Sequence, residues 1–389
     1  MTALMMSWIL AICTGHKIAS YLSDISGAFD RVFRDYMCAK LYAAGVGSKF
    51  LNFLLSYLEP RRAVVVAEGV KSDEFEISNQ VFQGTVLGPP LWNTFFSDVT
   101  IAASSTGGEP SMFADDLSVF QKFDRRVSNE ECLKTSYLCR ERVHKWGRAN
   151  RVAFDATKEH AVIIHPLSAE GDPFKLLGLL VDCKLVMLPA VEKILSQIKP
   201  KIRAILRTKK YYDNKTLISQ FKTHIWGVME CHSGGLFHIS DSVLKKLDQV
   251  HFQFLHELEM NASEAFTDFN FAPPMLRRNI GVLGLLHKRV LGLGHPIFQK
   301  LLPFCAELFN ETRPGRHNKQ LYGHLHEVNF QMVLYCHSIF AMTQVYNQLS
   351  QDVVNCKTVS HFQHCLTSIA RKACKDGNPE WMHSFSCRM

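Results

Sequence analysis

Two adjacent carboxylates, Asp115 and Asp116, lie between apolar residues in the segment 111–120. Apolar runs on both sides of a short polar centre predict a β-hairpin with the acidic pair at its tip. Neighbouring anions repel each other, so the pair is better explained if a cation lies beside it. Mg²⁺ or Mn²⁺, which take oxygen ligands, would suit this position. The alternative is a solvated Asp-Asp turn without a ligand.

A second acidic position, Asp24, follows residues 18–22, which have the character of a buried strand. From Phe29 onward the apolar residues recur with helical period, so Asp24 is expected where a strand leaves a sheet. Asp30 lies in the first turn of that helix, where we expect it to favour the helix dipole or the fold. Carboxylates that hold two divalent ions come from separate strands, and Asp24 together with the acidic hairpin would supply them.

Three segments, in this order, resemble the A, B and C motifs of reverse transcriptases, and their form is closest to the non-LTR (LINE-type) retrotransposon group. They are Asp-Ile-Ser-Gly-Ala-Phe-Asp at 24–30, Gln-Gly-Thr-Val-Leu-Gly-Pro at 83–89 and Phe-Ala-Asp-Asp at 113–116. The resemblance covers roughly residues 15–260. It implies an α+β fold, with a right-hand polymerase palm of the ferredoxin-like split β-α-β type followed by an all-helical thumb and a mostly helical C-terminal region.

The expected domains are a palm at 1–188, a thumb at 189–260 and a C-terminal region of unknown role at 261–389. Within them we expect a hairpin from 64–66 and 75–77, a long helix at 128–146 with Ser128 as its cap, and strands at 161–164, 174–181 and 185–188. Helices are expected at 191–206, 215–232 and 241–258. Reverse transcriptases normally have a fingers region before motif A, and only 23 residues precede Asp24, so a core truncated on its N-terminal side is expected.

The resemblance implies RNA-directed DNA polymerase activity, in which a dNTP is joined to the 3′-hydroxyl of a DNA primer on an RNA template. Two Mg²⁺ ions, with Mn²⁺ as a possible substitute, would be bound by Asp24 and Asp115, with Asp116 assisting. Phe29 would exclude a ribose 2′-hydroxyl, and the alternative is a core residue. Further roles are implied for Gln83 and Gly84 beside the incoming nucleotide, Lys158 at the pyrophosphate, and Leu177 and Gly178 as the primer grip.

Positive charge is concentrated after the expected palm. Residues 1–185 contain 20 Lys and Arg against 21 Asp and Glu, whereas residues 190–222 contain nine basic and two acidic residues. A basic helical segment beside a near-neutral catalytic body indicates contact with a nucleic-acid backbone, and the alternative is a solvated basic face. The residues expected to make this contact are Lys199, Lys201, Arg203, Arg207, Lys209 and Lys210.

Twelve cysteines without a C-x-x-C pair indicate reduced thiols, so neither a disulfide framework nor a zinc ribbon is expected. The nearest approach to a metal cluster is Cys356, His361, His364, Cys365 and Cys374. Its spacing matches no zinc template, which favours packing residues.

The apolar run 3–13 is too short to span a bilayer and is expected to be a buried helix on the sheet that begins at Ile18. No membrane segment or obligate protein partner is indicated, and an intracellular location, nuclear or cytoplasmic, is expected.

Two other functions remain open at this point. A truncated core could be a catalytically dead remnant of a retrotransposon that only binds nucleic acid, because loss of the fingers would weaken triphosphate binding. The second alternative is an RNA-dependent RNA polymerase or a maturase-like protein, which shares the palm. The polymerase activity itself is expected to be weak or absent in the truncated form.

Overall fold

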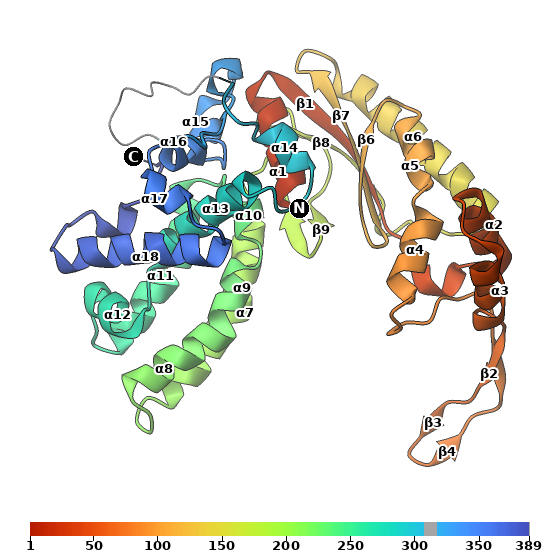
Figure 1. Ribbon diagram of the computed structural model, residues 1–389, viewed down its shortest axis with the longest axis horizontal. Coiled ribbons are helices and arrows are strands. Elements are labelled where there is room, and N and C mark those ends of the chain that lie inside the picture. The colour runs from red at the N-terminus through yellow and green to blue at the C-terminus, as the bar shows by residue number, and fades with distance from the viewer. Residues whose placement is uncertain (307–316, 389) are drawn as a thin grey trace. The chain divides into compact units, whose positions relative to one another are not determined.

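The computed structural model describes residues 1–306 and 317–388, and the chain divides into two compact units (Figure 1). The sheet unit comprises Lys17–Ile164 and Ser168–Asp172, and the helical unit comprises Met1–His16, His165–Leu167 and Pro173–Met389. Helices together with small sheets confirm the predicted α+β class. The domain boundaries expected at 188 and 260 stay predictions, because the two compact units have other boundaries.

The sheet unit is built on a four-stranded sheet with strand order β6-β7-β1-β8. Its strands are β1 (His16–Ser23), β6 (Glu109–Phe113), β7 (Asp116–Asp124) and β8 (His160–Ile164). β1 pairs antiparallel with β8, with Ser20 opposite Val162, and β6 pairs antiparallel with β7. Helical segments separate β1 from the β6–β7 hairpin, and one helix separates β7 from β8. The element order is therefore β-α-β-β-α-β, as the sequence predicted.

Five α-helices and one short 3-10 helix accompany this sheet: η1 (Ala28–Arg31), α2 (Arg34–Ala43), α3 (Ser48–Tyr57), α4 (Gly88–Phe96), α5 (Val99–Ser104) and α6 (Asn129–Asn150). The Ser128 hydroxyl accepts a hydrogen bond from the Glu131 amide, so the predicted cap of α6 is confirmed. The core of the unit joins sheet and helices through buried apolar side chains: Tyr21, Trp92, Phe95, Phe96, Leu117, Val119, Cys139 and Val143.

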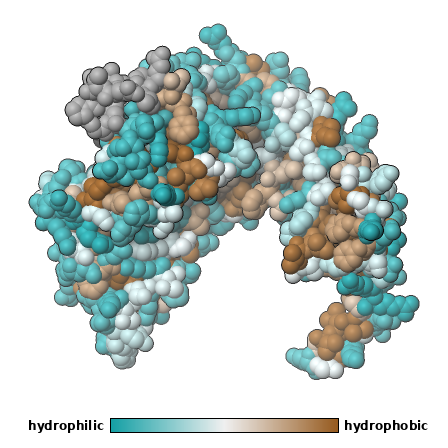
Figure 2. Space-filling view, in the orientation of Figure 1, coloured by the Kyte–Doolittle hydropathy of each residue, from teal (hydrophilic) through white to brown (hydrophobic). Residues whose placement is uncertain are grey.

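A two-part hairpin extends from α3; the strand predicted at 75–77 is confirmed, but its partner is 61–63 and not 64–66. It consists of β2 (Arg61–Ala63) with β5 (Phe75–Ile77), and β3 (Val66–Ala67) with β4 (Val70–Lys71). Its far end is apolar and exposed, as Figure 2 shows, and Val66 and Val70 are 59% and 73% exposed. This arm therefore contributes little to the core of the unit.

The helical unit begins with α1 (Thr2–Cys13), whose side chains are mostly buried. We expected α1 to pack on the sheet of β1, but it is grouped with the helical unit. It packs mainly against α14 (Ile297–Leu301), α15 (Met332–Cys336) and α10 (Ser233–Leu236). Trp8 of α1 also makes an edge contact with Phe174. The apolar run predicted the helix correctly, and tertiary contacts decided its partner.

The remaining elements of the helical unit are one hairpin, β9 (Phe174–Leu176) and β10 (Leu179–Val181), and a series of helices. The longer helices are α7 (Leu188–Arg207), α8 (Asn214–Phe221), α11 (Asp241–Glu257), α12 (Ala262–Phe269), α13 (Pro274–Val290) and α18 (Val359–Lys375). The shorter ones are η2 (Lys222–Trp226), α9 (Gly227–Glu230), α10 (Ser233–Leu236), α14 (Ile297–Leu301), η3 (Leu325–Glu327), α15 (Met332–Cys336), α16 (Met342–Asn347), α17 (Gln351–Val354) and η4 (Trp381–His383).

The strand expected at 185–188 is wrong. The Asp182 carboxylate accepts hydrogen bonds from the amides of Lys184, Val186 and Met187, which wraps this segment into a loop ahead of α7. Leu185 and Met187 also have positive φ angles, which a strand does not allow. An acidic side chain that captures several amides competes with sheet pairing, and apolar alternation alone did not reveal it.

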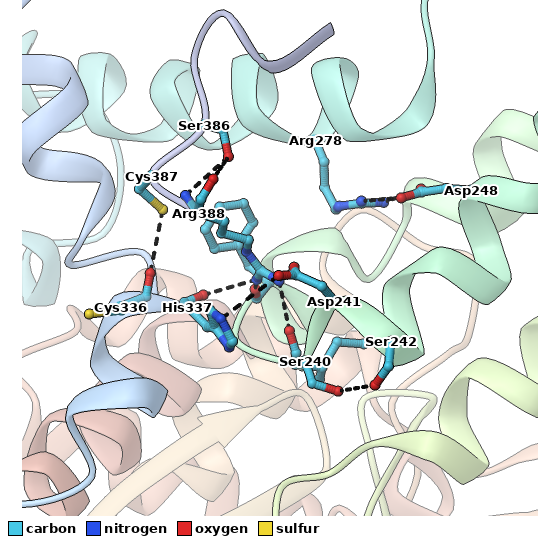
Figure 3. A network of polar contacts seen from close by, with 12 residues as sticks. Ser240, Asp241, Ser242, Asp248, Arg278, Cys336, His337, Ser386, Cys387 and Arg388 are labelled. Atoms are coloured by element: carbon cyan, nitrogen blue, oxygen red, sulfur yellow. Dashed lines mark hydrogen bonds and ion pairs between the residues drawn. The ribbon is translucent and has the colours of Figure 1, made fainter. Parts of the chain in front are cut away.

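A polar network ties the C-terminal end of the described chain to the start of α11 (Figure 3). The Arg388 guanidinium donates to the Asp241 carboxylate at 2.7 Å and to the carbonyls of Ile239, Phe237 and His337. In the same region Arg278 of α13 makes a two-pronged pair with Asp248 of α11. The first set of contacts joins the C-terminal segment to residues 147 positions earlier in the sequence, and the second joins α13 to α11. Among the described residues, no helix is both long and apolar enough to cross a bilayer.

Candidate active site

Asp24 lies where β1 ends, as the sequence predicted. Its Oδ1 accepts a hydrogen bond from the Ile25 amide at 3.0 Å, and its side chain is 15% exposed. Gly27 has a φ of 65°, which turns the chain sharply into the short helix η1. The carboxylate is thus held at a strand end rather than on a helix.

The acidic hairpin is confirmed. Phe113 pairs with Asp116, so Ala114 and Asp115 form the two-residue turn, and Asp116 is the first residue of β7. Ala114 has a φ of 55°, a left-handed conformation that is unfavourable for a residue with a side chain. The Trp92 indole donates a hydrogen bond of 3.0 Å to the Ala114 carbonyl, which helps to hold this turn.

Asp115 and Asp116 both lie close enough to Asp24 to feel its charge. Burial raises the pKa of Asp115, and the nearby Asp24 carboxylate raises it further. Burial likewise raises the pKa of Asp116, with added repulsion from Asp24 and Asp115. The fold therefore brings carboxylates from two neighbouring strands into one anionic cluster, which we call the acidic site (Asp24, Asp115 and Asp116).

The segment that carries Lys158 is bound to the end of β1 through its backbone. Ile25 forms a bridge with Phe154, and the Asp155 amide donates to the Asp24 carbonyl at 3.0 Å. The Lys158 ammonium contacts Asp24 Oδ2 at 2.5 Å, and this hydrogen bond and charge raise the pKa of Lys158. Lys158 thus provides a cation at the acidic site, although its side chain is 58% exposed.

Phe29 and the loop of Gln83 and Gly84 belong to the same unit. The Phe29 ring stacks on Trp92 with centroids 6.0 Å apart, and the Phe29 carbonyl accepts from the Val81 amide at 2.8 Å. Phe29 is half-buried and packs against the core. This contact agrees with the alternative in which Phe29 is a core residue. Gln83 and Gly84 are exposed on the loop before α4, and Gly84 has a φ of 78°.

Asp30 is exposed in η1, and the helix expected to run on from Phe29 is interrupted before α2 begins at Arg34. Its amide donates to the Gly27 carbonyl, which closes the short turn. The bond between the Val81 amide and the Phe29 carbonyl occupies a group that a continuous helix would use, which explains the interruption.

The other predicted site residues lie in the helical unit. Leu177 and Gly178, with φ angles of 48° and 85°, form the two-residue turn between β9 and β10. The six basic residues are all exposed on α7 and in the three residues after it: Lys199, Lys201, Arg203, Arg207, Lys209 and Lys210. Lys209 pairs with Glu259 at 3.6 Å.

Trp92 was missed by the sequence analysis as a residue that supports the site. It stacks on Phe29, lies in the core and donates to the turn of the acidic hairpin. Its place four residues after Gly88, on the helix that follows motif B, predicted only a core position. A tryptophan carries a polar N–H, and the need to pair that donor when it is buried is the signal that could have suggested the contact.

The donor set of the acidic site fits a hard divalent cation. All three side chains offer carboxylate oxygens, which Mg²⁺ and Mn²⁺ prefer, and a thiolate or imidazole is not among them. Burial, followed by the charge of neighbouring carboxylates, raises the pKa of Asp115 and Asp116, and a divalent cation would favour their ionised forms.

Comparison with known proteins identifies relatives of one kind. A stretch of 216 residues is 28% identical to the RNA-directed DNA polymerase from mobile element jockey of Drosophila funebris, and it covers 50% of this chain and 23% of that protein. A stretch of 200 residues is 26% identical to the probable RNA-directed DNA polymerase from transposon X-element of Drosophila melanogaster, and it covers 47% of this chain and 21% of that protein. The chain is similar to reverse transcriptases of non-LTR retrotransposons over about half of its length.

This similarity confirms the resemblance that the three motifs indicated. No family model matches the chain. The matched region spans less than a quarter of either reverse transcriptase, so the activities of those longer proteins are not transferred to this chain by similarity alone.

Proposed function

We propose that this chain is the polymerase core of a non-LTR retrotransposon reverse transcriptase and joins a dNTP to the 3′-hydroxyl of a DNA primer on an RNA template. The observation that carries the proposal is the convergence of Asp24 with Asp115 and Asp116 at neighbouring strand ends. The similarity to two RNA-directed DNA polymerases supports it independently. In this proposal the sheet unit contributes the palm, and the helical unit contributes the thumb.

Asp24 and Asp115 would hold two Mg²⁺ ions, with Asp116 assisting at the edge. When bound, these ions would supply activation of the primer hydroxyl and neutralisation of the leaving pyrophosphate. The chain positions its carboxylates on a strand end and a two-residue turn, both attached to the core. Such rigid supports restrict the movement of the ligands.

Lys158 is proposed to supply positive charge at the phosphates. In the structure its ammonium pairs with Asp24, where it offsets part of the charge of the acidic site. Its side chain is largely exposed, so it can exchange the Asp24 carboxylate for a phosphate oxygen once a divalent cation takes its place. The hydrogen bond and charge of Asp24 raise the pKa of Lys158 above a value that already keeps the ammonium protonated at neutral pH.

Phe29 is proposed to lie beneath the sugar of the dNTP and to exclude a 2′-hydroxyl, with Trp92 supporting its ring. Gln83 and Gly84 are proposed to line the nucleotide and the template, since Gly84 allows close approach of the backbone. Leu177 and Gly178 would contact the primer, and the basic residues of α7 would contact the phosphate backbone.

The test is primer extension by the full chain on an RNA template with Mg²⁺ and dNTPs, comparing the wild type with Asp115→Asn. We expect weak extension by the wild type and only background incorporation by the variant, because the amide cannot replace a carboxylate ligand of both ions. Asp73→Asn is the matched control, since it removes one aspartate charge from the exposed hairpin arm of the same unit. Extension by Asp115→Asn at the wild-type rate would refute the proposed role of the acidic site.

The alternative of a remnant that binds nucleic acid without synthesis is favoured by one observation, the exposed basic residues of α7. Binding of a labelled RNA–DNA primer–template, measured on the same samples, separates the two functions. The polymerase proposal requires both binding and extension. Retained binding with no extension by the wild type, under conditions that support Mg²⁺ binding, would favour the remnant.

A further inference from the structure

Three side chains of the helical unit converge at the start of α18. Cys356 lies two residues after α17, Thr358 caps α18, and His361 and Cys365 are four residues apart on one face of α18. Their donor atoms all lie within 4.8 Å of one another. Spacing along the sequence had not matched a zinc template, and His364 and Cys374 are not part of this group.

The distances within this group match those of a shared metal ion. Cys356 Sγ lies 3.8 Å from Cys365 Sγ, which in turn lies 3.8 Å from His361 Nε2. Two sulfurs bound to one tetrahedral zinc ion at about 2.3 Å are about 3.8 Å apart. A disulfide would need a separation of about 2.05 Å, so the two sulfurs are not bonded to each other.

The backbone around Cys356 is held by buried polar contacts. His287 Nε2 donates to the Cys356 carbonyl at 2.8 Å, and His287 Nδ1 accepts from the Tyr346 hydroxyl at 2.9 Å, because a carbonyl can only accept. The His287 ring also stacks on Phe362 of α18, with centroids 4.1 Å apart. These contacts fix the loop before α18 and the helix itself, so the ligands are positioned before a metal binds.

We propose that Cys356, His361 and Cys365 bind a zinc ion that fastens the α17–α18 loop to the first two turns of α18. Two thiolates and one imidazole are ligands that zinc accepts readily, whereas Mg²⁺ prefers oxygen. Three protein ligands leave a fourth position, and the exposed His361 places it toward solvent, where water can complete the tetrahedron. The site is chemically distinct from the acidic site and does not depend on the polymerase proposal.

The test is titration of the reduced, metal-free full chain with Co²⁺, which gives visible and thiolate charge-transfer absorption when bound tetrahedrally by sulfur. We expect one thiolate-bound Co²⁺ per chain, counted from the charge-transfer band, and its displacement by Zn²⁺. Cys356→Ser and Cys365→Ser should each weaken binding by more than about 100-fold, since loss of an outer partner alone costs about 10–100-fold. The control is Cys231→Ser, which removes an exposed thiol of the same unit outside the group.

Circular dichroism of each variant without metal verifies that the chain is folded. Binding by Cys231→Ser that equals the wild type, together with loss of the charge-transfer band in Cys356→Ser and Cys365→Ser, supports the zinc site. Equal Co²⁺ binding by the wild type and the Cys356→Ser/Cys365→Ser double variant would overturn it. The zinc site would also be overturned if the wild type bound no Co²⁺ while all its thiols were reduced.

Discussion

At the scale of single residues, the carboxylates of the acidic site, which we propose to be functional, lower the stability of the metal-free fold. Its three carboxylates lie close together, and Lys158 is the cation that contacts Asp24 in the structure. Burial and mutual repulsion raise the pKa of Asp115 and Asp116, so in the absence of a divalent cation their ionisation opposes folding. A fold that brings cation ligands together before the cation binds is expected to lose some stability in this way.

We predict that Asp115→Asn stabilises the metal-free chain at neutral pH. A raised folded-state pKa means that the folded wild type binds more protons than the unfolded chain between about pH 3.9 and the raised pKa. The wild type therefore loses stability as pH rises through that window, and the variant lacks this loss. Urea denaturation at neutral pH and below pH 4 measures the difference, which should be largest at neutral pH and small in acid.

Mg²⁺ should act in the opposite direction at the same residue. It should raise the denaturation midpoint of the wild type and leave that of Asp115→Asn nearly unchanged, because a ligand that binds only the folded state stabilises it. A variant that is less stable than the wild type at neutral pH without metal would contradict the repulsion argument.

At the scale of elements, α4 connects the core with both candidate catalytic segments through Trp92. Its ring stacks on Phe29 and its N–H donates to the Ala114 carbonyl in the acidic turn. Trp146 of α6 offers a close comparison in the same core region, because its N–H donates to Asp98 at 2.9 Å, away from the acidic hairpin. Substituting each tryptophan in turn therefore distinguishes a general loss of packing from an effect on the acidic site.

We predict that Trp92→Phe weakens Mn²⁺ binding at the acidic site, whereas Trp146→Phe does not. Each substitution keeps an aromatic ring but loses a hydrogen bond and some volume, and should cost about 1–3 kcal/mol of stability. Calorimetric titration with Mn²⁺ at a temperature where both variants are folded gives the affinity. Equal Mn²⁺ affinities in the two variants would assign Trp92 a packing role alone.

At the scale of the whole molecule, polar links between distant segments accompany apolar packing in both units. In the sheet unit Lys40 donates to Asp98 at 2.8 Å, and the helical unit contains such links as well. Arg388 and Asp241 are the clearest such link (Figure 3). Although partial burial opposes it, Arg388 lowers the pKa of Asp241 through a hydrogen bond and its charge.

We predict that Arg388→Lys destabilises the helical unit by about 1–3 kcal/mol, because an ammonium cannot reproduce the forked contacts to several carbonyls and a carboxylate. The lowered pKa of Asp241 means that this link stabilises the fold above the ordinary aspartate pKa and loses its contribution as pH falls through the lowered value. Urea denaturation followed by circular dichroism measures both effects. Arg62→Lys, in an exposed pair with Glu74, should leave stability unchanged.

Local signals in the sequence determined much of this protein. Apolar periodicity and capping predicted α6 from Ser128 and α11, and the acidic pair between two apolar runs predicted the β6–β7 hairpin. The three motifs indicated the reverse transcriptase relationship that comparison confirms. These features depend on residues close together in the chain, where side-chain pattern and backbone preference act directly.

Tertiary structure alone decided which distant groups meet. It grouped α1 with the helical unit, placed β1 between β7 and β8, turned 185–188 into a loop around Asp182, and brought Trp92 to the acidic turn. It also drew Cys356 toward His361 and Cys365 through buried contacts of His287. Pairings of this kind depend on the burial of whole surfaces and on the matching of distant donors and acceptors, which no local pattern encodes.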